Sequence, residues 1–124
     1  MKVKKIVLEN IRSYINQEIE FTNGITLLSG DIGSGKSTVL QALDFALFGI
    51  QKSSLSGQAL LRNGTVKGSV ELHFEIENIP IVIKRVLKKS KHTVVQDAGY
   101  IIKDGIKLDA TAVELKQQIL QLLN

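Results

Sequence analysis

The fold is decided by residues 27–38, LLSGDIGSGKST, where three glycines and three serines surround one lysine directly after an apolar run. Glycine at this density costs backbone entropy on folding, so a structural requirement must select it. Gly30, Gly35, Lys36 and Ser37 satisfy the pattern Gly, four residues of any kind, Gly, Lys and then Ser or Thr. This spacing is typical of a loop that binds phosphate groups.

The residue types of this loop suit a polyphosphate ligand. A loop that wraps phosphates must turn successive backbone N–H groups toward them, and glycine permits that close approach. We expect Lys36 to reach the β- and γ-phosphates as the catalytic cation, Ser37 to bind Mg²⁺, and Thr38 to hydrogen-bond the α-phosphate. The residues expected to bind nucleotide in the loop are Gly30, Asp31, Ile32, Gly33, Ser34, Gly35, Lys36, Ser37 and Thr38.

The segments on either side agree with this interpretation. Residues 25–28, ITLL, are mostly apolar and predict a buried strand. Residues 36–48, KSTVLQALDFALF, place apolar side chains at helical spacing, so the loop is expected to open a helix whose positive end faces the phosphates. A chance Gly/Ser turn would not require both elements.

Size and composition limit what surrounds the loop. The chain has 124 residues, a net charge of +4 and no cysteine. It is long enough for one small domain, and its basic balance permits an anionic partner such as nucleotide or nucleic acid. Disulfides and thiolate metal sites are excluded. Without a secretory segment or an apolar run near 18 residues, we expect no membrane association and a cytoplasmic location, nucleoid-associated in a prokaryote.

The remaining sequence predicts an α/β fold in one lobe. Residues 1–50 are expected to hold two strands, the loop and its helix, within a mixed sheet. Residues 65–109 predict an adjoining antiparallel meander, and residues 110–124 a closing helix that begins with the capping box Thr111/Glu114. The expected strands span residues 3–9, 17–21, 69–76, 81–87, 94–96, 100–103 and 106–108.

Two further patterns suggest sites but are better explained otherwise. His73 alternates with glutamates on the polar face of a strand, and with no second histidine at ligand spacing we expect a solvated face. Residues 55–58, LSGQ, resemble the Leu-Ser-Gly-Gly-Gln signature of ABC-type ATPases but lack one glycine and follow the loop helix directly. We expect a flexible loop there.

Positive charge gathers at a predicted hairpin. A solvated turn explains it, and contact with a nucleic acid backbone is the alternative, because such contact is electrostatic and independent of sequence. No aromatic residue is interleaved for base stacking. The possible DNA contacts are Lys84, Arg85, Lys88, Lys89 and Lys91, beside His92.

A carboxylate for hydrolysis is missing. Hydrolysis at such a loop needs an apolar run ending in Asp or Asp-Glu, which holds Mg²⁺ and orients water. Asp97 and Asp109 follow runs that polar residues interrupt, so both are interpreted as turn residues. The chain is therefore expected to be one piece of a divided catalytic unit, able to bind ATP and unable to hydrolyse it alone.

Residues along nearly the whole chain resemble one family. The chain is similar to the N-terminal lobe of SMC-type ABC ATPases at residues 10–14, NIRSY, at residues 42–49 after the loop, ALDFALFG, and at residues 61–64, LRNG, which VELHF follows. The resemblance is strongest to the Rad-fifty type, which works in DNA double-strand-break repair.

The resemblance implies an ATPase head of two lobes, joined in the full protein by a coiled coil. This chain would be the N-terminal lobe, with ATP and Mg²⁺ as cofactors. Its implied partners are the C-terminal lobe, a second head in an ATP-dependent homodimer, an Mre-eleven-type nuclease and DNA. Motif position places Arg12 and Ser13 beside the nucleotide, Arg12 near its phosphates, and puts Arg62 and Asn63 near the base or ribose.

Three alternatives stay open on the residues alone. An ABC transporter ATPase would share the loop, with Tyr14 as a possible adenine-stacking side chain. A P-loop kinase or GTPase would keep its acceptor or base within the same lobe, where no matching element is visible. A nonenzymatic module would contact DNA through the basic hairpin and bind it without ATP.

Overall fold

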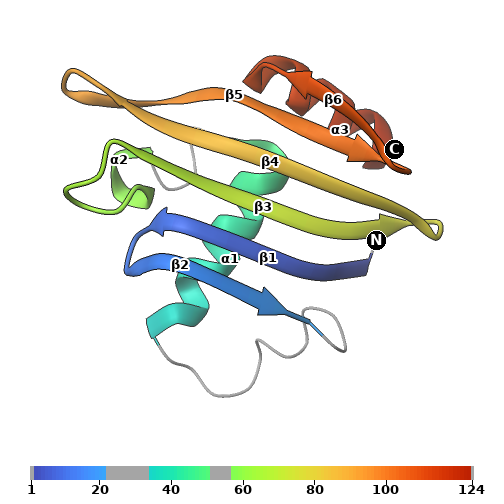
Figure 1. Ribbon diagram of the computed structural model, residues 1–124, viewed down its shortest axis with the longest axis horizontal. Coiled ribbons are helices and arrows are strands. Elements are labelled where there is room, and N and C mark those ends of the chain that lie inside the picture. Colours follow the sequence, from blue (N-terminus) through green and yellow to red (C-terminus); the bar gives the residue numbers. More distant parts are fainter. Residues whose placement is uncertain (1, 22–33, 51–56, 124) are drawn as a thin grey trace.

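A single antiparallel sheet forms the framework of the protein. The computed structural model describes residues 2–21, 34–50 and 57–123. Within them, six strands are ordered β2-β1-β3-β4-β5-β6 (Figure 1), and every described pairing is antiparallel. The strands are β1 (Lys2–Ile11), β2 (Tyr14–Glu20), β3 (Lys67–Ile76), β4 (Ile79–Ser90), β5 (Thr93–Lys103) and β6 (Ile106–Ala110).

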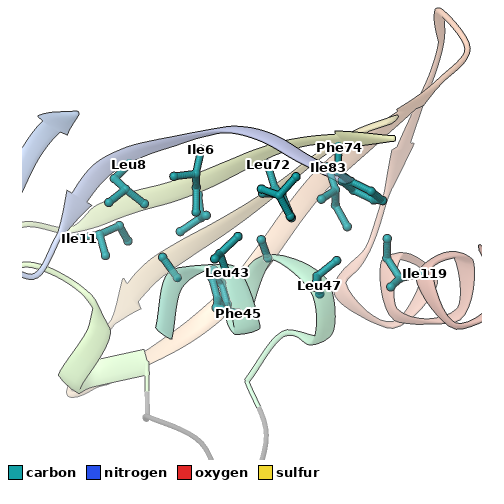
Figure 2. Packing of buried hydrophobic residues seen from close by; sticks show 14 of the residues in the cluster. Ile6, Leu8, Ile11, Leu43, Phe45, Leu47, Leu72, Phe74, Ile83 and Ile119 are labelled. Atoms are coloured by element: carbon teal, nitrogen blue, oxygen red, sulfur yellow. The ribbon is translucent and has the colours of Figure 1, made fainter. Parts of the chain in front are cut away.

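Helices cover one face of this sheet. They are α1 (Ser34–Phe48), α2 (Gly57–Leu60) and α3 (Ala112–Leu123). Figure 1 shows α1 crossing behind the central strands, while α3 lies behind β5 and β6. In Figure 2, Leu43 and Leu47 of α1 lie against the sheet that carries Ile6 and Leu72. All four side chains are at most 9% exposed, so the sandwich of α1 and sheet forms the core.

The sequence predicted most of these elements. Alternating side chains define β3, where Leu72 and Phe74 are buried and Glu71 and His73 lie on the other face. The capping box of α3 is confirmed: Thr111 Oγ1 accepts a 3.3 Å hydrogen bond from the Glu114 amide, and Glu114 Oε1 accepts one of 2.9 Å from the Thr111 amide. The strand expected over residues 25–28 lies outside the described residues.

Three details differ from the expectation. β1 pairs with β3, so the N-terminal strands and the meander belong to one sheet. Strand β5 is continuous over Thr93–Lys103, although residues 97–99 interrupt its pattern. Gly57 and Gln58 belong to the short helix α2, where a flexible loop was expected. Each difference depends on contacts between residues far apart in sequence. The β1–β3 pairing is itself such a contact, and neither a four-residue helix nor a polar stretch of strand has much stability on its own.

Candidate nucleotide-binding site

A pocket at the N-terminal part of α1 brings together residues from three separate segments. Its volume is about 360 Å³, and its lining includes Arg12 and Ser13 from the β1–β2 turn, Thr38 from α1 and Asn63 from the segment after α2. All four were predicted nucleotide contacts. Ala59 and Leu61 complete the lining. Residues 12, 38 and 63 are far apart in sequence, so the fold assembles this pocket.

Backbone contacts fix the turn that carries Arg12. Ile11 pairs with Tyr14, which leaves Arg12 and Ser13 as a two-residue turn. The backbone φ is positive at Arg12 (51°) and also at Asn10 (52°). A positive φ is costly for residues with a Cβ and persists where surrounding contacts hold it. The Arg62 amide donates a 2.9 Å hydrogen bond to the Asn10 carbonyl, and Ile11 forms a bridge with Leu61. The turn is thus fixed against the Leu61–Arg62 segment.

Side chains then set the charge of the pocket. Arg12 Nη1 donates to Gln41 Oε1 at 3.3 Å, and Arg62 Nη1 donates to the Arg12 carbonyl at 3.1 Å. Thr38 is only 4% exposed. The first turn of α1 carries no acidic residue of its own, and the positive end of a helix favours anions. Among the described residues that line the pocket, Arg12 is the one charged side chain and none is acidic, which favours an anionic ligand.

Gln41 is a contact that sequence reasoning missed. It follows Thr38 by three residues on α1, and residues at this spacing share a helix face. That spacing was the available signal for a polar side chain on the same helix face as Thr38, although Gln41 itself is not among the residues that line the pocket. The contact with Arg12 could not be anticipated, because it depends on how the β1–β2 turn meets α1.

The phosphate loop itself is only partly covered by the structure. Gly30, Asp31, Ile32 and Gly33 lie outside the described residues. Ser34, Gly35, Lys36 and Ser37 belong to α1, but their side chains lie outside the description as well. The roles assigned to Lys36 and Ser37 remain predictions. Among the described residues, no group of three or more His, Asp or Glu side chains could hold a metal ion.

The basic hairpin divides into parts with different surroundings. Lys88, Lys89 and Lys91 are exposed around the β4–β5 turn. Lys84 lies on the outer face of the sheet, with Nζ 5.9 Å from the centre of the Tyr100 ring. Only the turn lysines form an exposed basic tip.

The prediction for Arg85 is corrected, because Arg85 is 1% exposed and cannot reach a surface ligand. Its Nε donates to the Ala46 carbonyl at 2.7 Å and its Nη2 to the Leu47 carbonyl at 3.1 Å. Burial lowers the pKa of Arg85 to about 10, so the guanidinium still carries its charge at neutral pH. The missed signal was parity: Arg85 alternates in phase with the buried residues Ile81, Ile83 and Leu87.

A second, smaller pocket lies between the basic tip and the segment after α2. It measures about 200 Å³, and its lining includes Arg62, Asn63, Lys89 and His92. The Lys89 amide donates a 2.8 Å hydrogen bond to the Val66 carbonyl, which holds the two segments together. Asn63 lines both pockets, so the segment at residues 61–65 separates the candidate nucleotide site from the tip.

The two dismissed carboxylates lie in strands, where turns were expected. Asp97 in β5 accepts a 2.8 Å hydrogen bond from the Ala98 amide, and Asp109 in β6 lies 4.0 Å from Lys107 Nζ. His73 Nε2 lies 3.8 Å from Glu71 Oε2 on the outer face of the sheet. Neither aspartate belongs to the lining of the pocket at Arg12.

None of the helices in the described part of the chain is long and apolar enough to cross a membrane.

Comparison with known proteins places this geometry in context. The family model described as an AAA domain matches residues 5–124. The DNA double-strand break repair Rad50 ATPase of Methanococcus maripaludis is 38% identical over 124 residues, which cover 99% of this chain and 12% of that protein. The Rad50 ATPase of Methanosarcina mazei is 31% identical over 130 aligned residues, covering 100% of this chain and again 12% of the relative. The chain thus spans a small part of these relatives.

A solved structure supports the same fold. The structure of the recombination mediator protein RecF with ATP superimposes with a TM-score of 0.62 at 20% identity, covering 91% of this chain and 30% of RecF. At this identity the likeness establishes the fold alone. Together the comparisons confirm the predicted fold class and the resemblance to the Rad-fifty type.

Proposed function

We propose that this chain, which belongs to the AAA domain family, is the ATP-binding half of an ATPase head of the SMC and Rad50 type. The observation that carries the proposal is the pocket where Arg12, Ser13, Thr38 and Asn63 meet at the start of α1. Its volume of about 360 Å³ lies within the range of small-molecule sites. The helix that forms one wall carries the phosphate-loop motif at its N-terminus.

Different residues of the site would bind the triphosphate, the Mg²⁺ ion and the ribose or base of a nucleotide. The triphosphate would lie at the N-terminal end of α1, where backbone N–H groups and the helix dipole favour anions. Lys36 would neutralise the β- and γ-phosphates, with Arg12 approaching from the β1–β2 turn. Ser37 would provide a hydroxyl ligand for Mg²⁺, and Thr38 a hydrogen bond to the α-phosphate. Asn63 and Arg62 would lie toward the ribose or base.

Hydrolysis would require groups from outside the chain. The sequence has no long apolar run ending in Asp or Asp-Glu, the pattern that holds Mg²⁺ and orients water in such enzymes. We infer that a C-terminal lobe supplies this carboxylate and that two heads close around ATP as a homodimer. An Mre-eleven-type nuclease would act with the assembled head. The relatives' greater length, of which this chain covers 12%, leaves ample room for the missing lobe.

Calorimetry with a nonhydrolysable ATP analogue and Mg²⁺ tests the binding half of this proposal. We expect binding by the 124-residue chain, and phosphate release from ATP only after the C-terminal lobe is added in trans. Absence of analogue binding would contradict the assignment of the pocket. ATP turnover by the chain alone, abolished in Lys36→Ala, would contradict the divided-site proposal and make Asp97 or Asp109 the candidate Mg²⁺ partner.

A second function is supported by the exposed basic tip. Lys88, Lys89 and Lys91 are exposed at one end of the sheet, and Arg62 lies across the small pocket from Lys89. We propose that this tip contacts the phosphate backbone of DNA. Such contact would weaken steeply as salt rises, because bound phosphates release counterions when lysines neutralise them.

Fluorescence anisotropy with a duplex of arbitrary sequence tests the tip. The variant with Lys88, Lys89 and Lys91 all changed to Gln should bind DNA more weakly and with a shallower salt dependence, by about one unit of slope per lysine. A matched variant with Lys2, Lys103 and Lys107 changed to Gln removes the same charge elsewhere. Equal losses in both variants would show that net charge, and not the tip, governs binding. DNA binding that survives Lys36→Ala without ATP would favour the nonenzymatic module.

A further inference from the structure

Arg85 is the only charged side chain that is buried among the described residues. It lies on the helix side of β4, and its guanidinium makes three contacts. Nε and Nη2 donate to the carbonyls of Ala46 and Leu47, and Nη1 lies 3.5 Å from Gln96 Oε1 on β5. A buried charge is costly unless its donors are satisfied, so this placement serves a specific set of acceptors.

Those acceptors lie in the last turn of α1. The last carbonyls of a helix have no partner within the helix, and the helix dipole makes this end negative. The last turn of α1 contains no basic residue of its own. Arg85 therefore provides from a neighbouring strand the cation that a helix end usually takes from its own sequence.

Gly49, at the C-terminal end of α1, lies close to the Arg85 guanidinium. Gly49 follows the helix with a φ of 75°, and its amide donates a 2.7 Å hydrogen bond to the Phe45 carbonyl. A Cβ at position 49 would lie 2.8 Å from Gln96 Oε1 and 3.2 Å from Arg85 Nη1. The positive φ favours glycine at position 49, and a side chain there would also have to displace the Gln96 amide or the Arg85 guanidinium.

A bulge accompanies this contact on the next strand. Lys84 pairs with Tyr100 and Val86 with Asp97, so Ala98 and Gly99 together lie opposite Arg85. Such a bulge increases local twist and can redirect a side chain. The bulge therefore lies opposite the residue whose side chain contacts the end of α1.

The opposite end of α1 carries the phosphate-loop motif, and a 15-residue helix spans roughly 22 Å as a stiff rod. We propose that Arg85 is a positioning residue for nucleotide binding: it holds the C-terminal end of α1 on β4 and so sets where the N-terminal end presents its phosphate-binding groups. The inference rests on the proposed nucleotide-binding function. Arg85 itself touches no part of the pocket lining.

Substitutions at Arg85 separate positioning from simple stability. Arg85→Met keeps much of the volume and removes all donors, while Arg85→Lys keeps the charge but loses the planar fork that bridges two carbonyls. Ile101→Val is the control, since it makes a small cavity in the core at β5 and removes no hydrogen-bond donor to α1. Analogue affinity is measured by calorimetry well below each unfolding temperature and corrected for the folded fraction.

We expect about tenfold weaker binding for Arg85→Met, as when one charge-assisted hydrogen bond to phosphate is lost, and an intermediate affinity for Arg85→Lys. Ile101→Val should bind as the unmodified chain does. If Arg85→Met fails to fold, Arg85→Lys decides the question. Unchanged affinity in every folded Arg85 variant would overturn the inference while leaving the proposed function intact, whereas failure of the unmodified chain to bind would overturn both.

Discussion

The backbone amide of Arg12 donates a 2.9 Å hydrogen bond to the carbonyl oxygen of Leu60. This bond joins the β1–β2 turn to the end of α2, 48 positions later in the chain by residue number. The reciprocal bond from Arg62 to Asn10 lies beside it. Two of the pocket's walls are therefore parts of one hydrogen-bonded unit, so the predicted contacts from NIRSY and LRNG are held in place before any ligand binds.

Removing the Arg12 guanidinium should weaken nucleotide binding. We expect Arg12→Gly to lower affinity for an ATP analogue by about tenfold or more, the effect of losing one charge-assisted bond to phosphate. Glycine accepts the positive φ of this position, so the turn should persist. Lys107→Ala removes a cation from β6 and serves as the control in calorimetry. Equal affinity for Arg12→Gly and the control would contradict the placement of Arg12 at the phosphates.

The Thr38 hydroxyl should contribute to affinity without supporting the fold. Thr38→Val keeps the β-branched shape of a side chain that is 4% exposed and removes its hydrogen-bonding oxygen. We expect binding to weaken by about threefold to tenfold, corresponding to roughly 0.5–1.5 kcal/mol for one hydrogen bond. Calorimetry gives the affinity, and urea unfolding of the free chain checks the fold. Binding unchanged by this substitution would remove Thr38 from the site.

Gly99 should tolerate no side chain. A Cβ at this position would collide with the carbonyl oxygen of Lys84, a backbone atom that cannot move aside cheaply. We expect Gly99→Ala to lower the free energy of unfolding by more than about 3 kcal/mol, as for other steric conflicts in a core. Gly64→Ala is the control: its φ is 84° with open space around it, so it should cost about 1–2 kcal/mol. Similar losses for both would argue against the bulge opposite Arg85.

Tyr100 should titrate at unusually high pH. Burial and the 2.6 Å hydrogen bond from its hydroxyl to Glu71 Oε1 raise the pKa of Tyr100 to about 12. Because the folded pKa exceeds the ordinary value of 10, the related stability is present below pH 10 and is lost as pH rises from 10 toward 12. Tyrosinate absorbance in a Tyr14→Phe background follows this residue. Glu71→Gln should lower the pKa of Tyr100 only in part, since burial remains; an unchanged pKa would contradict the role of Glu71.

The sequence predicted elements whose signal is local. Alternation in SVELHFEI located β3, and Thr111 with Glu114 marked the start of α3, because the atoms that form these features are neighbours in the chain. Four of the predicted nucleotide contacts line one pocket: Thr38 was predicted from the loop motif, and Arg12, Ser13 and Asn63 from family resemblance. Their proximity depends on the Arg12–Leu60 bond and on the packing of α1, which no local pattern reveals.

Arg85 shows where a compositional argument goes wrong. Counting cations from Lys84 to Lys91 grouped a buried side chain with exposed ones, although strand parity placed Arg85 with Ile83. Charged side chains are usually exposed, yet two carbonyls at a helix end can accept hydrogen bonds from an arginine that lies in the core. Those carbonyls lie about 38 residues earlier in the chain, so only the tertiary structure brings them to Arg85.

The central claim is that the chain binds a nucleoside triphosphate through the loop at the start of α1. The most direct measurement is calorimetry with a nonhydrolysable ATP analogue and Mg²⁺ on the unmodified chain, on Lys36→Ala and on the control Lys107→Ala. Lys36 is the one side-chain cation in the loop, and charge-assisted bonds to phosphate each contribute roughly 1.5–3 kcal/mol. We predict that the unmodified chain and Lys107→Ala bind alike and that Lys36→Ala loses tight binding. Equal affinity for all three would contradict the account.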